Sequence, residues 1–106
     1  GGTHDNDTLV GYFTSIEKWE LGYIREYVEC REGSVEDLVD KIFKVAYESV
    51  ANLVIFQIQD ILKIGYIGRM NLPSSMGTNW RWRMLDGQFG AKEIERLRYL
   101  CDIYGR

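Results

Sequence analysis

The sequence predicts an α/β fold that is mostly helical and contains one or two buried parallel strands. Residues 53–58, Leu-Val-Ile-Phe-Gln-Ile, are a nearly continuous run of β-branched and large apolar residues, which is typical of a strand covered on both faces. Amphipathic helical patterns precede this run and follow the loop after it. In parallel βα folds ligands bind at the carboxyl ends of the strands, where Gln59 and Asp60 stand in this chain.

Three helical segments are expected before the strand. Residues 9–16 form a short helical turn, and residues 18–30 carry apolar side chains at close to helical spacing. Ser34 is a good N-cap for a third helix, which first-turn acids stabilise and which we expect to end near residues 50–52. The apolar stripe expected on this third helix comprises Leu38, Val39, Ile42, Val45, Ala46 and Val50.

A long loop and a final helix are expected after the strand. Glycines, serines, Asn71 and Pro73 indicate a loop over residues 65–77, and loops of this length in small domains are usually functional. Residues 79–83, Asn-Trp-Arg-Trp-Arg, can bind a sugar, or their tryptophans can anchor the loop by packing. The last helix spans about residues 91–104 and ends at Gly105. Its expected apolar face comprises Ile94, Leu97, Leu100, Cys101 and Tyr104.

Composition excludes several classes of protein and site. A length of 106 residues indicates one domain or a piece of one, and the opening Gly-Gly in place of Met points to a cleaved tag or an excised segment of something longer. The net charge of −3 argues against nucleic-acid binding. No run is apolar enough for a membrane span and no signal peptide opens the chain, so we expect no membrane partner and a cytoplasmic location. With free thiols expected at Cys30 and Cys101 and a single His, neither a metal site nor a cofactor is expected.

Residues 2–8, Gly-Thr-His-Asp-Asn-Asp-Thr, form a polar run without one apolar side chain. The neighbouring imidazole and carboxylate of His4 and Asp5 can bind adjacent sugar hydroxyls, and such a carboxylate can stabilise an oxocarbenium-like transition state. Alternatively the run only caps a helix, because Asp, Asn and Thr are all good N-caps before the apolar Leu9. The residues by themselves leave both interpretations open.

Several motifs in chain order resemble the carboxy-terminal part of the 4-α-glucanotransferases, the amylomaltases or disproportionating enzymes of glycoside hydrolase family 77. They are residues 2–8 with Gly11, Gln59–Asp60, residues 69–73 (Arg-Met-Asn-Leu-Pro), residues 79–83, and residues 97–98 with 104–106. The resemblance spans the whole chain. It departs from the family at residues 63–68, where Gly-Leu-Gly, an acid and Ala are common, and at Ser74, where Gly usually follows the proline.

This resemblance implies that residues 1–106 are the last βα units of a (β/α)₈ barrel, with residues 53–58 as its eighth strand. It implies transfer of an α-1,4-glucan segment to the 4-hydroxyl of an acceptor, with retention, through a covalent glycosyl-enzyme. Asp5 would be the catalytic carboxylate that stabilises the transition state. His4 and Asn71 would bind the substrate. The nucleophile and the acid/base would precede the first residue, so the chain alone is expected to be inactive.

The expected partners are α-1,4-glucans (maltooligosaccharides) and further copies of the chain. A piece of a barrel leaves strand edges and apolar surface open, which favours self-association. Two other hypotheses stay open from the residues. One is a non-catalytic glucan-binding module in which the tryptophans matter more than Asp5, and the other is a plain interaction domain.

Overall fold

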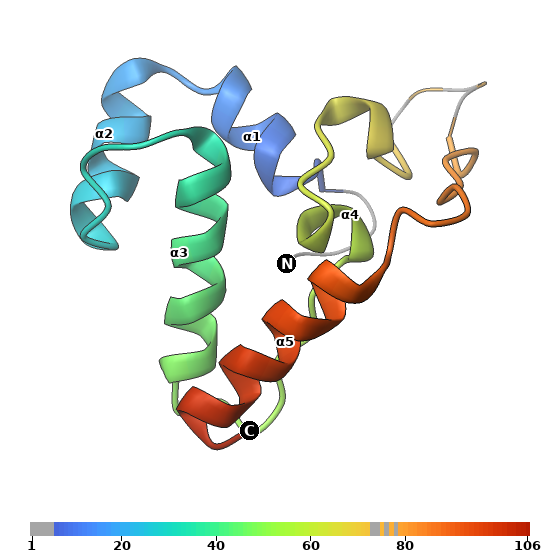
Figure 1. Cartoon of the computed structure of the whole chain (residues 1–106). Coiled ribbons are helices and arrows are strands. Elements are labelled where there is room, and N and C mark those ends of the chain that lie inside the picture. Colours follow the sequence, from blue (N-terminus) through green and yellow to red (C-terminus); the bar gives the residue numbers. More distant parts are fainter. Residues whose placement is uncertain (1–5, 73–74, 76, 78) are drawn as a thin grey trace.

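Helices α3 (Val35–Glu48) and α5 (Ala91–Tyr104) form a V whose arms meet at their C-terminal ends (Figure 1). The computed structural model describes residues 6–72, 75, 77 and 79–106. Above and beside the V lie the shorter elements α1 (Leu9–Ser15), α2 (Lys18–Tyr27), α4 (Ile58–Ile61) and the 3₁₀ turn η1 (Tyr66–Gly68). The prediction of a mostly helical chain is confirmed for these residues. No helix in the described part of the chain has the length and apolarity needed to cross a bilayer.

Local capping explains where the two long helices begin and end. At the start of α3 the Ser34 hydroxyl accepts the Asp37 N–H, and the Asp37 carboxylate accepts the Ser34 N–H, each at 3.1 Å. At α5 the Glu93 carboxylate accepts the Gly90 N–H at 3.0 Å. Helix α5 stops where Gly105 takes a left-handed conformation, with φ 67°. The predicted start of α3 and both predicted ends of α5 are confirmed, whereas α2 ends at Tyr27, earlier than predicted.

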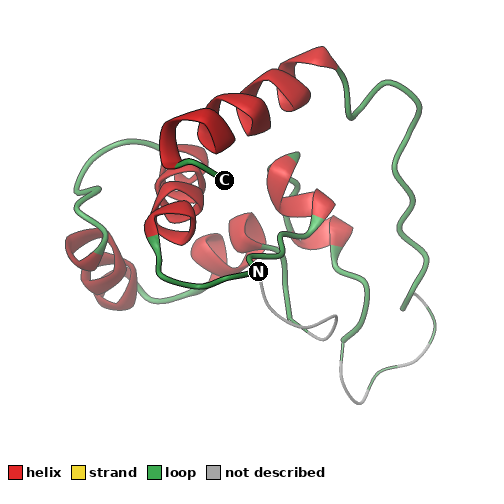
Figure 2. Cartoon of the chain, turned by 90° about the horizontal axis from the view of Figure 1, so that it is seen from below, coloured by secondary structure: helices red, strands yellow, loops and turns green. Residues whose placement is uncertain are grey.

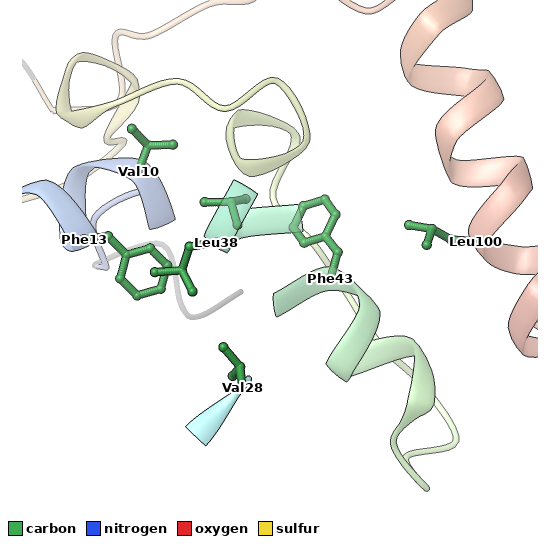
Figure 3. Packing of buried hydrophobic residues seen from close by; sticks show 7 residues of the cluster. Val10, Phe13, Val28, Leu38, Phe43 and Leu100 are labelled. Carbon is green, nitrogen blue, oxygen red and sulfur yellow. The ribbon is translucent and has the colours of Figure 1, made fainter. Parts of the chain in front are cut away.

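The core lies against α3, and α1 and α5 close it from two sides (Figure 3). Its buried apolar residues are Val10, Phe13, Val28, Leu38, Val39, Phe43 and Leu100. The stripe predicted for α3 is correct at Leu38 and Val39 but wrong at Val50, which is fully exposed because the helix ends two residues before it. On the face predicted for α5, Leu100 is buried, but Ile94 is 46% exposed.

The predicted buried strand is not confirmed. Among the described residues there are only helices and loops (Figure 2). Leu53 and Ile55 are each 74% exposed, so burial on both faces is wrong for this segment, while Phe56 packs on Phe43 with ring centroids 4.3 Å apart. The physical reason is that a strand needs a second strand to pair its N–H and C=O groups. No described segment pairs with residues 53–57 in this way, and the chain turns into α4 at Ile58.

Polar contacts hold the two arms of the V together. At the apex the Tyr104 hydroxyl donates to Glu48 at 3.1 Å, and the Arg106 guanidinium donates to the Ser49 carbonyl at 2.7 Å. Nearer the open end, Asp40 of α3 pairs with Lys63 at 3.0 Å and with Arg96 of α5 at 3.1 Å. Helix α3 is therefore joined by polar contacts to α5 and to Lys63, which follows α4.

Val39 and Val50 allow a matched test of this core. Val39→Ala removes two buried methyl groups and should lower the free energy of unfolding by about 2 kcal/mol. Val50→Ala removes the same groups from solvent and should change it by less than about 0.5 kcal/mol. Urea unfolding followed by circular dichroism measures both values. Equal effects of the two substitutions would contradict the packing described above.

Candidate functional site

A hollow of about 430 Å³ opens where the polar N-terminal run meets α1, α4 and the segment after η1. We call it the first hollow. Its lining residues are Asn6, Asp7, Leu9, Tyr12, Ser15, Asp60 and Arg69. Two carboxylates, a guanidinium, an amide and two hydroxyl-bearing side chains therefore face one space, which is a lining suited to a ligand rich in hydroxyl groups.

The end of the polar run is fixed by local hydrogen bonds. The Thr8 side chain is fully buried, and its hydroxyl accepts the Gly11 N–H at 3.1 Å, which caps α1. The Asp7 carboxylate accepts the Thr8 N–H at 2.7 Å and lies over Gly11, where a Cβ would approach it to 2.5 Å. The capping interpretation of this run is thus confirmed at Thr8. Position 11 requires glycine because the Asp7 carboxylate lies too close for any Cβ.

Asp60 is a buried carboxylate that contacts the start of α1. The residue is only 1% exposed, and its Oδ1 accepts the Leu9 N–H at 2.7 Å. Leu9 is the first residue of α1, so its N–H has no acceptor within that helix. Burial raises the pKa of Asp60, and the Leu9 N–H offsets part of that rise.

Gln59, the neighbour of Asp60, contacts a different segment. The side chain belongs to a residue that is 6% exposed, and its Nε2 donates to the Gly68 carbonyl at 3.0 Å. Gly68 ends the η1 turn, and a Cβ there would approach the Gln59 side chain to 3.3 Å. The chain after this turn continues directly to Arg69 and Asn71.

Arg69 lines both the first hollow and a second hollow of about 570 Å³. Its Nε donates to the Asn71 carbonyl at 3.0 Å, and its guanidinium lies 5.9 Å from the Tyr66 ring centroid. The second hollow is lined by Tyr66, Ile67, Arg69, Leu72, Ser75, Asn79, Arg81 and Trp82. An arginine common to both walls can bind a ligand that extends from one hollow into the other.

Asn79 holds the loop that borders the second hollow. Its Oδ1 accepts the Leu72 N–H at 2.9 Å, and its Nδ2 donates to the Ser75 carbonyl at 3.0 Å. Trp82 is half-buried and lines the hollow, whereas Trp80 is 49% exposed and has a left-handed backbone, with φ 63°. Trp80 therefore lies at the surface of the loop and is not a core anchor.

The predicted site residues fall in two groups. His4 and Asp5 lie outside the described residues, although Asn6 and Asp7, which follow them in the sequence, line the first hollow. Asn71 is described and half-buried, and its carbonyl is bound by Arg69. The sequence did not predict that Arg69 lines both hollows. It placed Gln59–Asp60 at a strand end but did not predict that they are buried. The signal available for their burial was a polar pair directly after an apolar run.

Comparison with known proteins identifies the family. The model of glycoside hydrolase family 77, described as 4-alpha-glucanotransferase, matches residues 1–88. The chain belongs to glycoside hydrolase family 77. The family assignment thus confirms the resemblance carried by the polar run and the motifs at residues 59–60 and 69–73.

Relatives of this family-77 chain match it along its length. A 4-alpha-glucanotransferase from Synechocystis is 38% identical over 107 residues, covering 99% of this chain and 20% of that protein. A chloroplastic/amyloplastic 4-alpha-glucanotransferase from Arabidopsis thaliana is 35% identical over 108 residues, covering 99% of this chain and 18% of its own length. The chain therefore spans about a fifth of the curated relatives it matches.

A solved family-77 structure has the same fold over this stretch. Amylomaltase from Streptococcus agalactiae, in complex with acarbose, superposes with a TM-score of 0.88 at 29% sequence identity. The match covers 100% of this chain and 21% of the amylomaltase chain. The helical arrangement described above is thus similar to one segment of a larger enzyme. Among the described residues of this chain, no group of three His, Cys, Asp or Glu side chains could hold a metal ion.

The buried Asp60 of this family-77 chain predicts a specific pH dependence. Because burial raises its pKa, its contribution to stability is complete below the ordinary carboxyl pKa of 3.8 and is lost as the pH rises through the raised value. Asp60→Asn keeps the oxygen that accepts the Leu9 N–H but does not titrate. Relative to wild type, this variant should therefore gain stability between about pH 3 and pH 7. Urea unfolding at both pH values measures the difference in unfolding free energy between the variant and wild type. A difference that is the same at both pH values would contradict the expectation.

Proposed function

We propose that residues 1–106 are the C-terminal segment of the catalytic (β/α)₈ barrel of a 4-α-glucanotransferase. The observation that carries this proposal is the superposition of the whole chain on a fifth of an amylomaltase, together with the family match over residues 1–88. In such a barrel residues 53–57 would be completed as a strand by neighbours from the rest of the protein. The exposed Leu53 and Ile55 are consistent with a segment that lacks those neighbours.

The proposed reaction transfers an α-1,4-glucan segment from a donor to the 4-hydroxyl of an acceptor glucan. A carboxylate nucleophile bonds to the anomeric carbon while the donor's glycosidic oxygen leaves and takes a proton from the acid/base. The acceptor hydroxyl then displaces the enzyme carboxylate and returns its proton to the same acid/base. Two displacements at one carbon retain its configuration. The nucleophile and the acid/base would lie in the part of the protein before residue 1.

Asp5, His4 and Asn71 are the residues that this chain would supply. The Asp5 carboxylate would bind the hydroxyls of the reacting sugar and strengthen these bonds as positive charge develops on its ring. His4 would hydrogen-bond the same sugar, and Asn71 would contact it from the loop after η1. The hydroxyl- and charge-lined hollow beside Asn6 supports this assignment, since it opens directly next to the run that carries Asp5.

The 106-residue chain and its longer parent separate this proposal from a binding module. Incubated with maltotriose, the chain alone should form no longer maltooligosaccharides, because two of the three carboxyl groups are missing. The parent should form them, and Asp5→Asn in the parent should lower kcat about a hundredfold or more. Chromatography of the products measures both. Robust synthesis by the chain alone, or full activity of the Asp5→Asn parent, would contradict the proposal.

Titration calorimetry with maltoheptaose tests the glucan-binding alternative. If the chain were a binding module, Trp80→Ala or Trp82→Ala would weaken binding more than Asp5→Asn. Under the transferase proposal the chain alone binds weakly, because it supplies only one side of the sugar site. A micromolar affinity that depends on the tryptophans but not on Asp5 would favour the module.

We also propose that the isolated chain self-associates. Helix α2 has no buried residue and presents Trp19, Tyr23 and Tyr27 to solvent, one helical turn apart, and the extended residues 53–57 expose two further apolar side chains. Light scattering should therefore show a dimer or larger species. The double variant Leu53→Ser/Ile55→Ser should shift this chain toward monomer, whereas Val50→Ser, at a more exposed residue outside the segment, should not. A monomer at high concentration would contradict this expectation.

A cytoplasmic location without membrane or nucleic-acid partners completes the proposal. The net charge of −3 supports the last part of it, since phosphate backbones are bound mainly by excess Lys and Arg. The Arabidopsis relative is named as a chloroplastic/amyloplastic protein, a compartment other than the one proposed here. Fluorescence imaging of the tagged parent protein would test the location directly.

A further inference from the structure

Gln59 and Asp60 of α4 are adjacent polar residues, expected from the sequence at a ligand-binding edge, that have no role in the proposed reaction. Both residues are almost completely buried, at 6% and 1% exposure. A buried polar group is stable only where it is hydrogen-bonded. Their partners therefore show what the pair does in the fold.

The two partners lie on different segments, one that precedes α4 in the sequence and one that follows it. Asp60 accepts the N–H of Leu9, a residue 51 positions earlier, at 2.7 Å. Gln59 donates to the carbonyl of Gly68, nine positions later, at 3.0 Å. Neighbouring residues of a helix point in different directions, so one turn of α4 can hold both segments at once. Figure 1 shows α4 beside the start of α1 and below the η1 turn.

Each held segment continues into one part of the proposed glucan site. Leu9 follows Thr8 and Asp7, whose side chains cap α1 and close over Gly11, so the polar run has little freedom at this end. His4 and Asp5 belong to the same run. On the other side, Gly68 precedes Arg69, whose side chain lines both hollows and binds the Asn71 carbonyl.

We propose that Gln59 and Asp60 are positioning residues of the glucan site. Asp60 sets the position of Leu9, which follows the run that carries His4 and Asp5 in the sequence. Gln59 sets the position of Gly68, which precedes the loop that carries Arg69 and Asn71. Together they fix the start of α1 relative to the end of the η1 turn, the two described segments that lead into the proposed site. The inference rests on the proposed transferase function, but its structural part is measurable without activity.

Hydrogen exchange of backbone amides in the 106-residue chain tests the two contacts separately. Asp60→Ala should speed exchange of the Leu9 amide about tenfold or more, while the Gly68 and Arg69 amides, which bond to Gly65 and Tyr66, keep their rates. Gln59→Met keeps the size of the side chain. It should speed exchange of the Gly68 and Arg69 amides, while the Leu9 amide keeps its rate. Asp60→Asn should restore protection of Leu9. Equal acceleration at all three amides by either variant would show general loosening and overturn the proposal.

Leu9→Pro provides a second variant that deletes the donor, and Leu9→Ala, which keeps the N–H but also loses the half-buried leucine side chain, is its matched control. Proline is tolerated at the first position of a helix, and Thr8, with φ −65° and ψ 158°, already has the backbone conformation favoured before proline. In the longer parent protein, Leu9→Pro and Asp60→Ala should each lower kcat by about tenfold, and the double variant should fall no further than either alone. Multiplicative losses would show that the two residues act independently and overturn the proposal.

The split between kcat and KM distinguishes positioning from loss of stability. Asp60→Ala should lower kcat for maltotriose with little change in KM, Gln59→Met should mainly raise KM, and Asp60→Asn should recover most of the activity. Leu100→Val is the matched control, since it opens a small space in the core on α5 and should leave both constants unchanged. If that control changes them as Asp60→Ala does, the role is only structural and the proposal is overturned. A wild-type parent without transferase activity would refute the proposed function instead. Hydrogen exchange would then still test whether Asp60 and Gln59 hold Leu9 and Gly68.

Discussion

The hydrogen bond from the Leu9 N–H to the buried Asp60 carboxylate is the contact on which the arrangement of the site depends. It joins the first helix to a residue 51 positions away and supplies the acceptor that the first residue of α1 lacks within its own helix. Gln59 adds a contact to Gly68 in the other direction. Two adjacent buried polar side chains thus connect segments that the hydrophobic core alone does not place, since apolar packing is not directional.

The hydrophobic core stabilises the segments that Gln59 and Asp60 connect, but it does not by itself determine how these segments are placed. Leu38, Val39 and Phe43 of α3 are buried against α1 and the segment before α4, and Leu100 closes the packing from α5. Asp40 then pairs with cations of two other segments, Lys63 just after α4 and Arg96 in α5. The short helix α4 has only four residues and would not be stable alone, so its position depends on these neighbours.

Local sequence rules predicted the elements that depend on local contacts. The Ser34 cap, the stripe through Leu38 and Val39, and the end of α5 at Gly105 follow from residues within one or two turns. The segment 53–58 could not be predicted in this way, because a strand forms only where another strand pairs with it. The burial of Asp60 and the position of Arg69 between two hollows also depend on contacts distant in sequence. The family resemblance identified the motif that includes Asn71, but the structure describes neither His4 nor Asp5.

Central to the proposed function is that Asp5, in the polar run that precedes α1, would present its carboxylate to a glucose ring at the reaction centre. A crystal structure of the longer parent protein with bound acarbose tests it most directly. We expect the Asp5 carboxylate to bond hydroxyls of the inhibitor, with His4 and Asn71 on the same ring system and the Leu9–Asp60 hydrogen bond intact. An inhibitor bound elsewhere, or an Asp5 side chain directed away from it while that hydrogen bond is present, would contradict the claim.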